Sequence, residues 1–124
     1  MPAITVEEVQ HALQHNFKGN VSSGLCAIPS QLFKHMRGDS LVPLTALINK
    51  CIIEETPPTS LKLTKLVPLF KGKGSEEDCN NYRGLAVMHP FTKLIMCILN
   101  NRLTNISNEN NLRAPTQAGF RSKY

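Results

Sequence analysis

The first apolar residues of the chain recur at the spacing of an α-helix. Val6, Val9 and Leu13 fall on one side of a helix when they are placed at the helical period. Thr5 stands just before this stripe and Glu8 follows it three residues later, which is the pattern of a capping box. The sequence therefore predicts an amphipathic helix that begins after Thr5 and ends in a glycine-containing loop.

Two further helices are predicted in the first half of the chain. The shorter one has Pro29 in its first turn and carries Leu32, Phe33 and Met36. A Gly-Asp-Ser break follows it, and the longer helix then runs until the proline pair at 57–58 stops it. The apolar positions of the longer helix are Leu44, Leu47, Ile48, Cys51 and Ile52.

The pattern changes to that of a β-hairpin after residue 60. Leu61, Leu63 and then Leu66-Val67 predict a strand that runs to Phe70, with Lys62 and Lys65 interleaved. The Lys-Gly-Lys-Gly-Ser segment at 71–75 predicts a turn, and a second strand is predicted over Tyr82–Met88. The two strands would pair as a hairpin with a long connection.

The last predicted element is a helix with one apolar face. Its apolar residues are Phe91, Leu94, Ile95, Ile98, Leu99 and Leu103. The predicted fold class is therefore α+β, with N-terminal helices followed by a β-hairpin and a packed helix. We divide the chain into a helical leader region over residues 1–59 and a second region over residues 60–124.

Charge is distributed unevenly between these two regions. The chain carries a net charge of +5, but residues 1–59 hold four Lys or Arg against five Asp or Glu, whereas residues 60–124 hold ten against four. A basic segment of this kind favours an anionic partner, and nucleic acid or a nucleotide is the usual one. The alternative is an ordinary solvated basic surface.

The cysteines and the N-terminus bear on the cellular compartment. The four cysteines stand far apart with no Cys-x-x-Cys pair, which does not match a structural zinc site. The chain shows no secretory signal pattern and no apolar run of membrane-spanning length. We therefore expect an intracellular protein of the cytoplasm or nucleus, with free cysteines and no membrane partner.

Five short motifs in the second region carry a resemblance to a known family. They are Leu66–Ser75 (LVPLFKGKGS), Asn81–Val87 (NYRGLAV), Lys93-Leu94, Asn101–Leu103 (NRL) and Gln117–Arg121 (QAGFR). In this order and spacing they resemble the fingers region of the reverse transcriptases of non-LTR retrotransposons. The first half is similar to the leader of the same family, so the resemblance covers nearly the whole chain.

The resemblance implies that this chain is part of an RNA-directed DNA polymerase, a nucleotidyltransferase with a right-hand fold. It would help to position the template and the incoming nucleotide. The partners implied are an RNA or DNA template–primer, a deoxynucleoside triphosphate, and the palm and thumb of the same polymerase.

The carboxylates that such a polymerase needs for catalysis are absent from this sequence. Two-metal nucleotidyl transfer requires several carboxylates that converge on the metal ions. The chain has two aspartates, Asp39 and Asp78, and no Asp-Asp pair. We expect the chain to stop before the catalytic palm, to hold no Mg²⁺ itself and to be inactive as a polymerase on its own, with no catalytic residue.

The resemblance assigns the nucleotide contact to Lys71, Lys73 and Arg83, because basic residues of the family's hairpin reach the triphosphate. Fixed cations stabilise the charge on phosphate oxygens during phosphoryl transfer, and the Arg83 guanidinium can bind two of these oxygens at once. Lys62, Lys65 and Arg121 are the candidates for phosphate contacts with the template or primer. Further basic residues that could line the same path are Lys93, Arg102, Arg113 and Lys123.

Two alternatives to a working polymerase fragment remain open. They are a nucleic-acid-binding module that has lost catalysis and an inert transposon relic.

The chain departs from the family at two positions. Cys26 replaces an acidic residue that is common in the leader, and Leu61 replaces a common aromatic residue. His11 and His15 have a spacing that can bind a metal ion, but no third ligand accompanies them, so the sequence favours coincidence.

Overall fold

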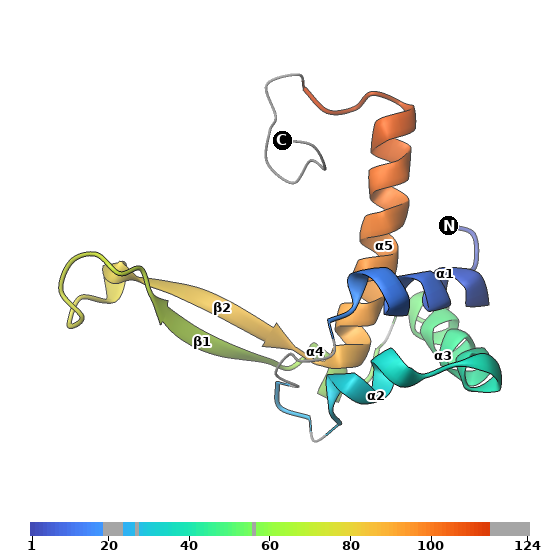
Figure 1. Ribbon diagram of the computed structural model, residues 1–124, viewed down its shortest axis with the longest axis horizontal. Coiled ribbons are helices and arrows are strands. Elements are labelled where there is room, and N and C mark those ends of the chain that lie inside the picture. Colours follow the sequence, from blue (N-terminus) through green and yellow to red (C-terminus); the bar gives the residue numbers. More distant parts are fainter. Residues whose placement is uncertain (19–23, 27, 56, 115–124) are drawn as a thin grey trace.

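The computed structural model describes residues 1–18, 24–26, 28–55 and 57–114, which form a mixed α+β structure (Figure 1). These residues contain five α-helices, one π-helical turn, two 3-10 turns and one two-stranded antiparallel sheet. In chain order the elements are α1 (Val6–His11), η1 (Ala12–Asn16), α2 (Ser30–His35), η2 (Gly38–Ser40), α3 (Leu41–Ile53), α4 (Thr59–Lys62), β1 (Thr64–Phe70), η3 (Cys79–Asn81), β2 (Tyr82–Met88) and α5 (Pro90–Glu109).

The first helix begins at the predicted capping box. The Thr5 hydroxyl accepts a hydrogen bond from the Glu8 backbone N–H at 3.3 Å, and the Glu8 carboxylate accepts one from the Thr5 N–H at 2.9 Å. The α-helix passes into a π-helical turn at Ala12, and Val9 and Leu13 are buried. The predicted first helix is therefore confirmed, with a wider turn at its end.

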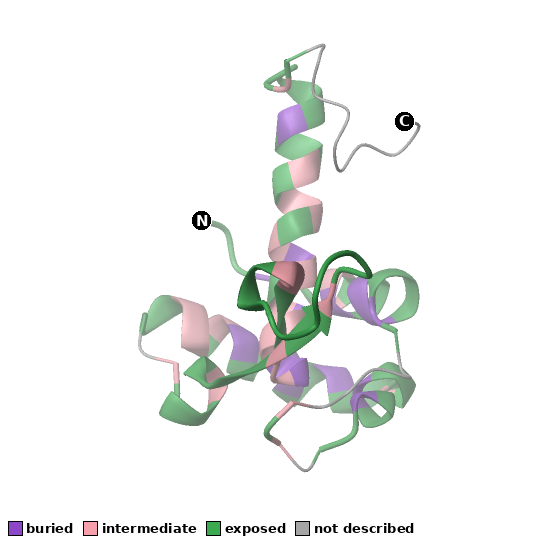
Figure 2. Ribbon diagram, turned by 90° about the vertical axis from the view of Figure 1, so that its left-hand side faces the viewer, coloured by how far each residue is buried: buried purple, intermediate pink, exposed green. Residues whose placement is uncertain are grey.

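A single core joins the two predicted regions of the chain, and helices and their flanking segments supply all of it. Buried residues of the leader helices and of the first half of α5 belong to one cluster, so the leader region and α5 share this core. Figure 2 colours these buried positions purple. The buried apolar residues are Ile4, Val9, Ala12, Leu13, Phe17, Phe33, Leu41, Leu44, Ile48, Phe91, Leu94 and Ile98. The β-hairpin contributes none of them.

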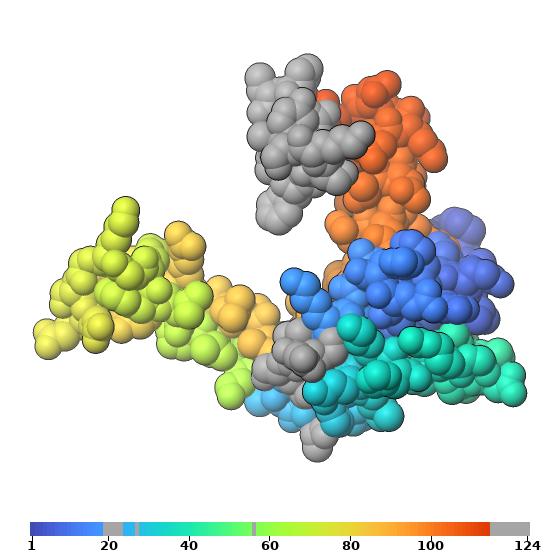
Figure 3. All heavy atoms as spheres, viewed as in Figure 1, coloured from blue at the N-terminus to red at the C-terminus, as the bar shows by residue number. Residues whose placement is uncertain are grey.

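Strands β1 and β2 form an arm that projects from the helical body (Figures 1 and 3). Their antiparallel register pairs Thr64 with Met88 at the base and Phe70 with Tyr82 at the far end. Both faces of the arm are largely open to solvent, and the Leu66 side chain is 70% exposed. The α+β class and the hairpin agree with the sequence prediction.

The first strand is shorter than predicted. We expected it to begin at Leu61, but Leu61 and Lys62 belong to the helical turn α4, and β1 begins at Thr64. The Leu61 N–H donates to the Pro58 carbonyl at 2.9 Å, and the Leu61 carbonyl accepts from the Thr92 hydroxyl at 3.1 Å. Leu61 also packs against the core, so tertiary contacts override the alternating pattern at this point.

Helix α5 extends past the core. Phe91, Leu94 and Ile98 are buried as predicted, but Leu103 is 65% exposed although it shares their apolar pattern. The helix continues to Glu109, and its second half stands clear of α2 and α3 in Figure 1. Within the described residues, no helix combines the length and the apolar character needed to cross a bilayer.

Candidate nucleotide and nucleic-acid interface

The predicted turn between the strands forms at the far end of the arm. Gly72 and Gly74 adopt positive φ angles of 73° and 83°, a region that favours glycine. The Lys71 N–H donates to the Asn81 carbonyl at 2.8 Å and continues the pairing of the strands by one step. The segment from Lys71 to Ser75 is thus a turn, as its composition predicts.

Hydrogen bonds brace the connection that follows the turn. The Asn81 side-chain amide donates to the Ser75 carbonyl at 2.8 Å, and the Tyr82 hydroxyl donates to the Glu76 carbonyl at 2.9 Å. A Cβ atom added at Gly74 would lie 2.4 Å from the Asn81 amide nitrogen, so the loop closes tightly on this glycine. Asn81 and Tyr82 therefore have structural contacts that fix the start of β2.

Arg83 and Lys65 lie on the same face of the arm. Arg83 pairs with Leu69, and Lys65 stands four residues before Leu69 on β1. Because strand side chains alternate between faces, the two cations share a face and are separated along it by about 13 Å. Both side chains are exposed, and neither makes a hydrogen bond or ion pair within the described ranges. Their charges are open to an external anion.

The two lysines of the turn differ in what they contact. The Lys71 ammonium donates to the Asn80 carbonyl at 2.7 Å, so it closes the loop across its own connection. Lys73 is exposed and has no hydrogen-bond or ion-pair partner among the residues the structure describes. Of the three predicted nucleotide contacts, Lys73 and Arg83 have free charges, whereas Lys71 has an internal partner.

The remaining predicted contacts are not gathered at the turn. Lys62 is exposed on α4 at the base of the arm. Arg121 and the motif at 117–121 lie outside the described residues. The connection also carries three exposed acidic residues, Glu76, Glu77 and Asp78, which follow Lys73 within five positions of the chain. The net charge of residues 60–124 does not show that acidic residues of the connection offset some of this positive charge.

Three further basic residues have internal partners instead of an open surface. The Lys93 ammonium lies 5.7 Å from the centre of the Phe17 ring. The Arg113 guanidinium donates to the Ser107 hydroxyl at 3.2 Å. Arg102, which the sequence suggested for the template path, makes four hydrogen bonds to the N-terminal segment, as described next.

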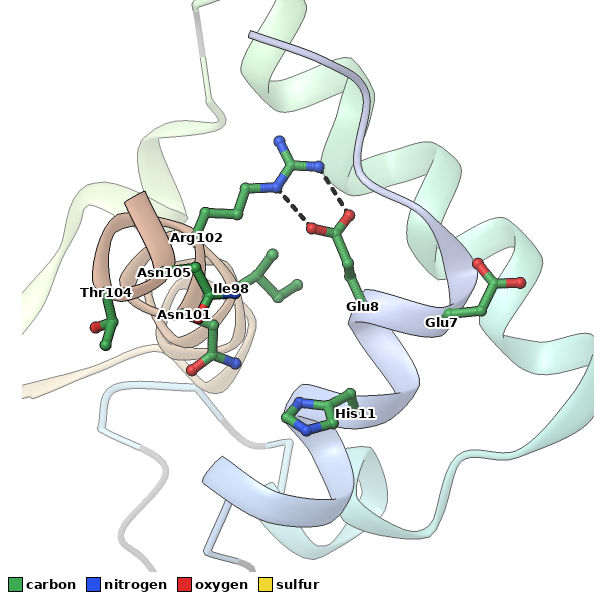
Figure 4. A pocket seen from close by; sticks show the side chains of 8 residues that line it. All are labelled: Glu7, Glu8, His11, Ile98, Asn101, Arg102, Thr104 and Asn105. Atoms are coloured by element: carbon green, nitrogen blue, oxygen red, sulfur yellow. Dashed lines mark hydrogen bonds and ion pairs between the residues drawn. The ribbon is translucent and has the colours of Figure 1, made fainter. Parts of the chain in front are cut away.

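Arg102 on α5 binds Glu8 on α1 through two parallel contacts (Figure 4). Its Nε and one terminal nitrogen reach the two carboxylate oxygens at 2.6 and 2.7 Å, and the guanidinium also donates to the carbonyls of Pro2 and Ala3 at 2.7 and 2.9 Å. The hydrogen bond from Arg102 holds the pKa of the Glu8 carboxyl below its usual range. Sequence reasoning missed this pair, because the two residues are 94 positions apart.

A pocket of about 490 Å³, lined mostly by polar residues, opens beside this ion pair, between α1 and α5 (Figure 4). Its lining residues include Glu7, His11, Asn101 and Asn105. The Asn101 amide donates to the Asn16 side chain at 3.0 Å, so part of its wall is held by a contact between α5 and η1. The pocket is remote from the exposed cations of the hairpin turn in chain position and in fold.

The two aspartates do not form a metal site for nucleotidyl transfer. Asp78 lies in the connection at the far end of the arm, where its carboxylate accepts hydrogen bonds from the Asn80 backbone and side chain at 2.9 and 3.0 Å. Asp39 lies in η2, directly before α3. Within the described ranges, no group of three or more His, Cys, Asp or Glu residues is placed to hold a metal ion.

Comparisons with known proteins add no assignment to this geometry. No family model matches the chain, no curated protein matches it, and no solved structure matches its fold.

Proposed function

We propose that this chain is the fingers portion of an RNA-directed DNA polymerase of a retrotransposon, in which the β1–β2 arm positions the incoming deoxynucleotide and the template. The observation that carries the proposal is an exposed hairpin arm whose Arg83 and Lys73 have no hydrogen-bond or ion-pair partner in the part of the chain that the structure describes. The arm is built from two of the motifs that resemble the fingers of such polymerases. The chain by itself does not polymerise, because it lacks the converging carboxylates of the palm.

The chemistry of the arm suits a triphosphate. Negative charge on phosphate oxygens increases toward the transition state of nucleotidyl transfer, and cations held in fixed positions stabilise it. The Arg83 guanidinium can donate to two oxygens in one plane, and Lys73 adds a point charge from the turn. The hydrogen bonds of Asn81 and Tyr82 fix the backbone that presents Arg83, so less ordering is needed on binding.

The exposed apolar surface supports a role within a larger assembly. Leu66, Leu69 and Leu85 on the arm and Leu103 on α5 are each more than half exposed. Burial of these side chains against a partner would remove apolar surface from water and so stabilise the contact. In the proposed polymerase, the palm and thumb would cover it.

A second candidate is a nucleic-acid-binding module without catalysis. It is favoured by Lys65 and Arg83, which share one face of the arm with the apolar side chains of Val67 and Leu85 between them. Such a face can contact two phosphates of one strand in any sequence. Binding of this module would not depend on a deoxynucleotide, which distinguishes it from the first proposal.

Replacement of Arg83 tests the proposal in a polymerase that joins this chain to a palm and thumb. Arg83→Ala should lower kcat/KM for the deoxynucleotide by about 10- to 100-fold, since a charge-assisted hydrogen bond contributes roughly 1.5–3 kcal/mol. Part of the loss should appear in KM and part in kcat, because phosphate charge grows toward the transition state. Arg83→Lys should restore only part of the activity, since a point charge cannot reproduce the planar fork.

The matched control is Lys34→Ala, which removes an exposed cation from α2, outside the arm. It should leave nucleotide kinetics unchanged, and primer–template affinity should be similar in all variants. A melting curve excludes unfolding. Unaltered nucleotide kinetics in the folded Arg83→Ala enzyme would show that the arginine is an ordinary surface residue.

A further inference from the structure

His11 and His15 stand side by side on the first helical segment, at the junction of α1 and η1. Their ring centroids are 4.6 Å apart with the ring planes tilted by 39°. Both side chains are exposed, and neither ring has a hydrogen-bond or ion-pair partner among residues 1–18, 24–26, 28–55 and 57–114. The second histidine belongs to a π-helical turn, a feature that is frequent at functional sites.

Two adjacent neutral imidazoles on one side of a helix can bind one metal ion as a chelate. Imidazole nitrogen is a favoured ligand of Zn²⁺, Ni²⁺ and Cu²⁺. Histidines four residues apart on a helix place both rings within reach of the same ion. A separation of 4.6 Å between ring centroids requires only rotation about the side-chain torsions to direct one nitrogen of each ring at a shared ion.

We propose that His11 and His15 form a two-imidazole site for a divalent transition-metal ion of the Zn²⁺ and Ni²⁺ class. The nearby carboxylate of Glu7 does not join it, because its side chain points away from His11 (Figure 4). No third His, Cys, Asp or Glu completes the set among the described residues. Water therefore occupies the other coordination positions.

The surroundings give the bound ion open positions. His11 lines the 490 Å³ pocket between α1 and α5, together with the polar side chains of Asn101, Thr104 and Asn105. Water bound to the ion on this side can donate to the amide oxygens of that wall. Because the two histidines belong to α1 and η1, the ion also links the α-helical and π-helical parts of the segment. Metal binding should therefore raise the melting temperature.

The test uses the 124-residue chain without an affinity tag, titrated with NiCl₂ in isothermal titration calorimetry at pH 7.5. Nickel is the probe because imidazole binds it well, whereas Zn²⁺ would also be attracted to the four thiols. Wild-type protein should bind one Ni²⁺ at this pair. His11→Ala and His15→Ala should each weaken binding by at least about tenfold, because the second imidazole acts at a high effective concentration.

His35→Ala is the matched control, since it removes an exposed imidazole from α2 without touching the pair. It should leave the affinity unchanged. Paramagnetic Ni²⁺ should broaden the ring-proton NMR signals of His11 and His15 before those of the other histidines. Binding that persists in the two pair variants, or no binding by the wild-type protein, would overturn the proposal.

Discussion

Two polar side chains fasten the N-terminal segment to helices that lie far from it in the sequence. The Asn49 side chain on α3 accepts from the Ile4 N–H at 2.7 Å and donates to the Ile4 carbonyl at 2.8 Å, as a neighbouring strand would. Arg102 on α5 binds Glu8 and the carbonyls of Pro2 and Ala3. Each side chain satisfies backbone or carboxylate groups that would otherwise lose their hydrogen bonds on folding.

Removal of the Arg102 guanidinium should destabilise the protein measurably. We expect Arg102→Ala to lower the free energy of unfolding by about 1–2 kcal/mol, near the lower range for hydrogen bonds to charged groups, because the pair is partly exposed. In a chain of this size that corresponds to a fall in Tm of about 4 °C for each kcal/mol. Urea denaturation of Arg102→Ala, Glu8→Gln and the double variant measures the coupling between the two side chains.

If the losses of unfolding free energy in the two single variants add up to the loss in the double variant, the assignment is contradicted. Side chains that interact must instead show a coupling free energy. The pH dependence gives a second check. The folded-state pKa of Glu8 is depressed by Arg102, so the stabilisation is present above the unfolded-state pKa and is lost as the pH falls through the folded-state value. Wild-type protein should lose more stability than Glu8→Gln between pH 6 and pH 3.

At the scale of single elements, the turn of the β1–β2 arm depends on two glycines in different ways. Gly72 and Gly74 both have positive φ angles. A Cβ atom at Gly72 would meet nothing within 4 Å, whereas one at Gly74 would clash with the Asn81 side chain, which is bonded to the Ser75 carbonyl. Gly72 is therefore needed for its left-handed backbone conformation. Gly74 is needed for that conformation and also because the Asn81 side chain leaves no room for a Cβ atom.

We expect Gly74→Ala to disturb the arm more than Gly72→Ala. Substitution at Gly72 should cost about 1 kcal/mol for the left-handed conformation, while Gly74→Ala adds the displacement of Asn81. The arm lies outside the core, so global Tm should change little in either variant. Amide hydrogen exchange of the β1 and β2 residues is the suitable measurement, because it reports local opening. Equal protection in the two variants would refute the packing role of Gly74.

At the base of the arm, contacts between segments that are distant in the sequence also decide the local conformation. Gly24 has a φ of 69°, and a Cβ atom there would lie 3.0 Å from the Val87 carbonyl oxygen. The leader loop thus approaches the end of β2 closely. Where β1 begins is also set by packing, since Leu61 is bound through its carbonyl to Thr92 and enters α4 instead of the strand. These contacts fix the arm to the helical body at its base.

At the scale of the whole molecule, the basic charge of the second region is only partly available to a ligand. Lys93, Arg102 and Arg113 have internal partners, and Lys71 closes its own loop. The free cations of the described part that belong to the predicted sites are Lys62, Lys65, Lys73 and Arg83. The acidic residues of the connection oppose them, so the arm attracts anions less than the net charge suggests.

We expect weak, sequence-independent binding of single-stranded RNA or DNA, with a dissociation constant on the order of 1–100 µM at physiological salt. The affinity should fall steeply with added salt, because counterions are released from the phosphates. Fluorescence anisotropy of a labelled oligonucleotide over a salt series measures it. Lys65→Ala with Arg83→Ala should reduce the salt slope, whereas Lys34→Ala should leave it unchanged. Salt-independent binding would exclude the phosphate contacts.

The sequence by itself determined the features that depend on neighbouring residues. The capping box at Thr5, the turn after Phe70, the strand from Tyr82 to Met88 and the helix after Pro90 all follow from signals within a few positions. The register of the arm then places Lys65 and Arg83 on one face, because side chains alternate along paired strands.

Only the tertiary structure decided which charges are free and where the apolar pattern is buried. Arg102 and Glu8 are 94 positions apart, and their pairing depends on how α5 packs against α1, which no local pattern encodes. Leu61 and Leu103 have the same side chain, but Leu61 packs against the core and Leu103 is exposed. The reason is that the core ends before the second half of α5, where Leu103 lies. Burial and ion pairing over such separations arise from the joint packing of several helices, and that packing becomes definite only in the folded chain.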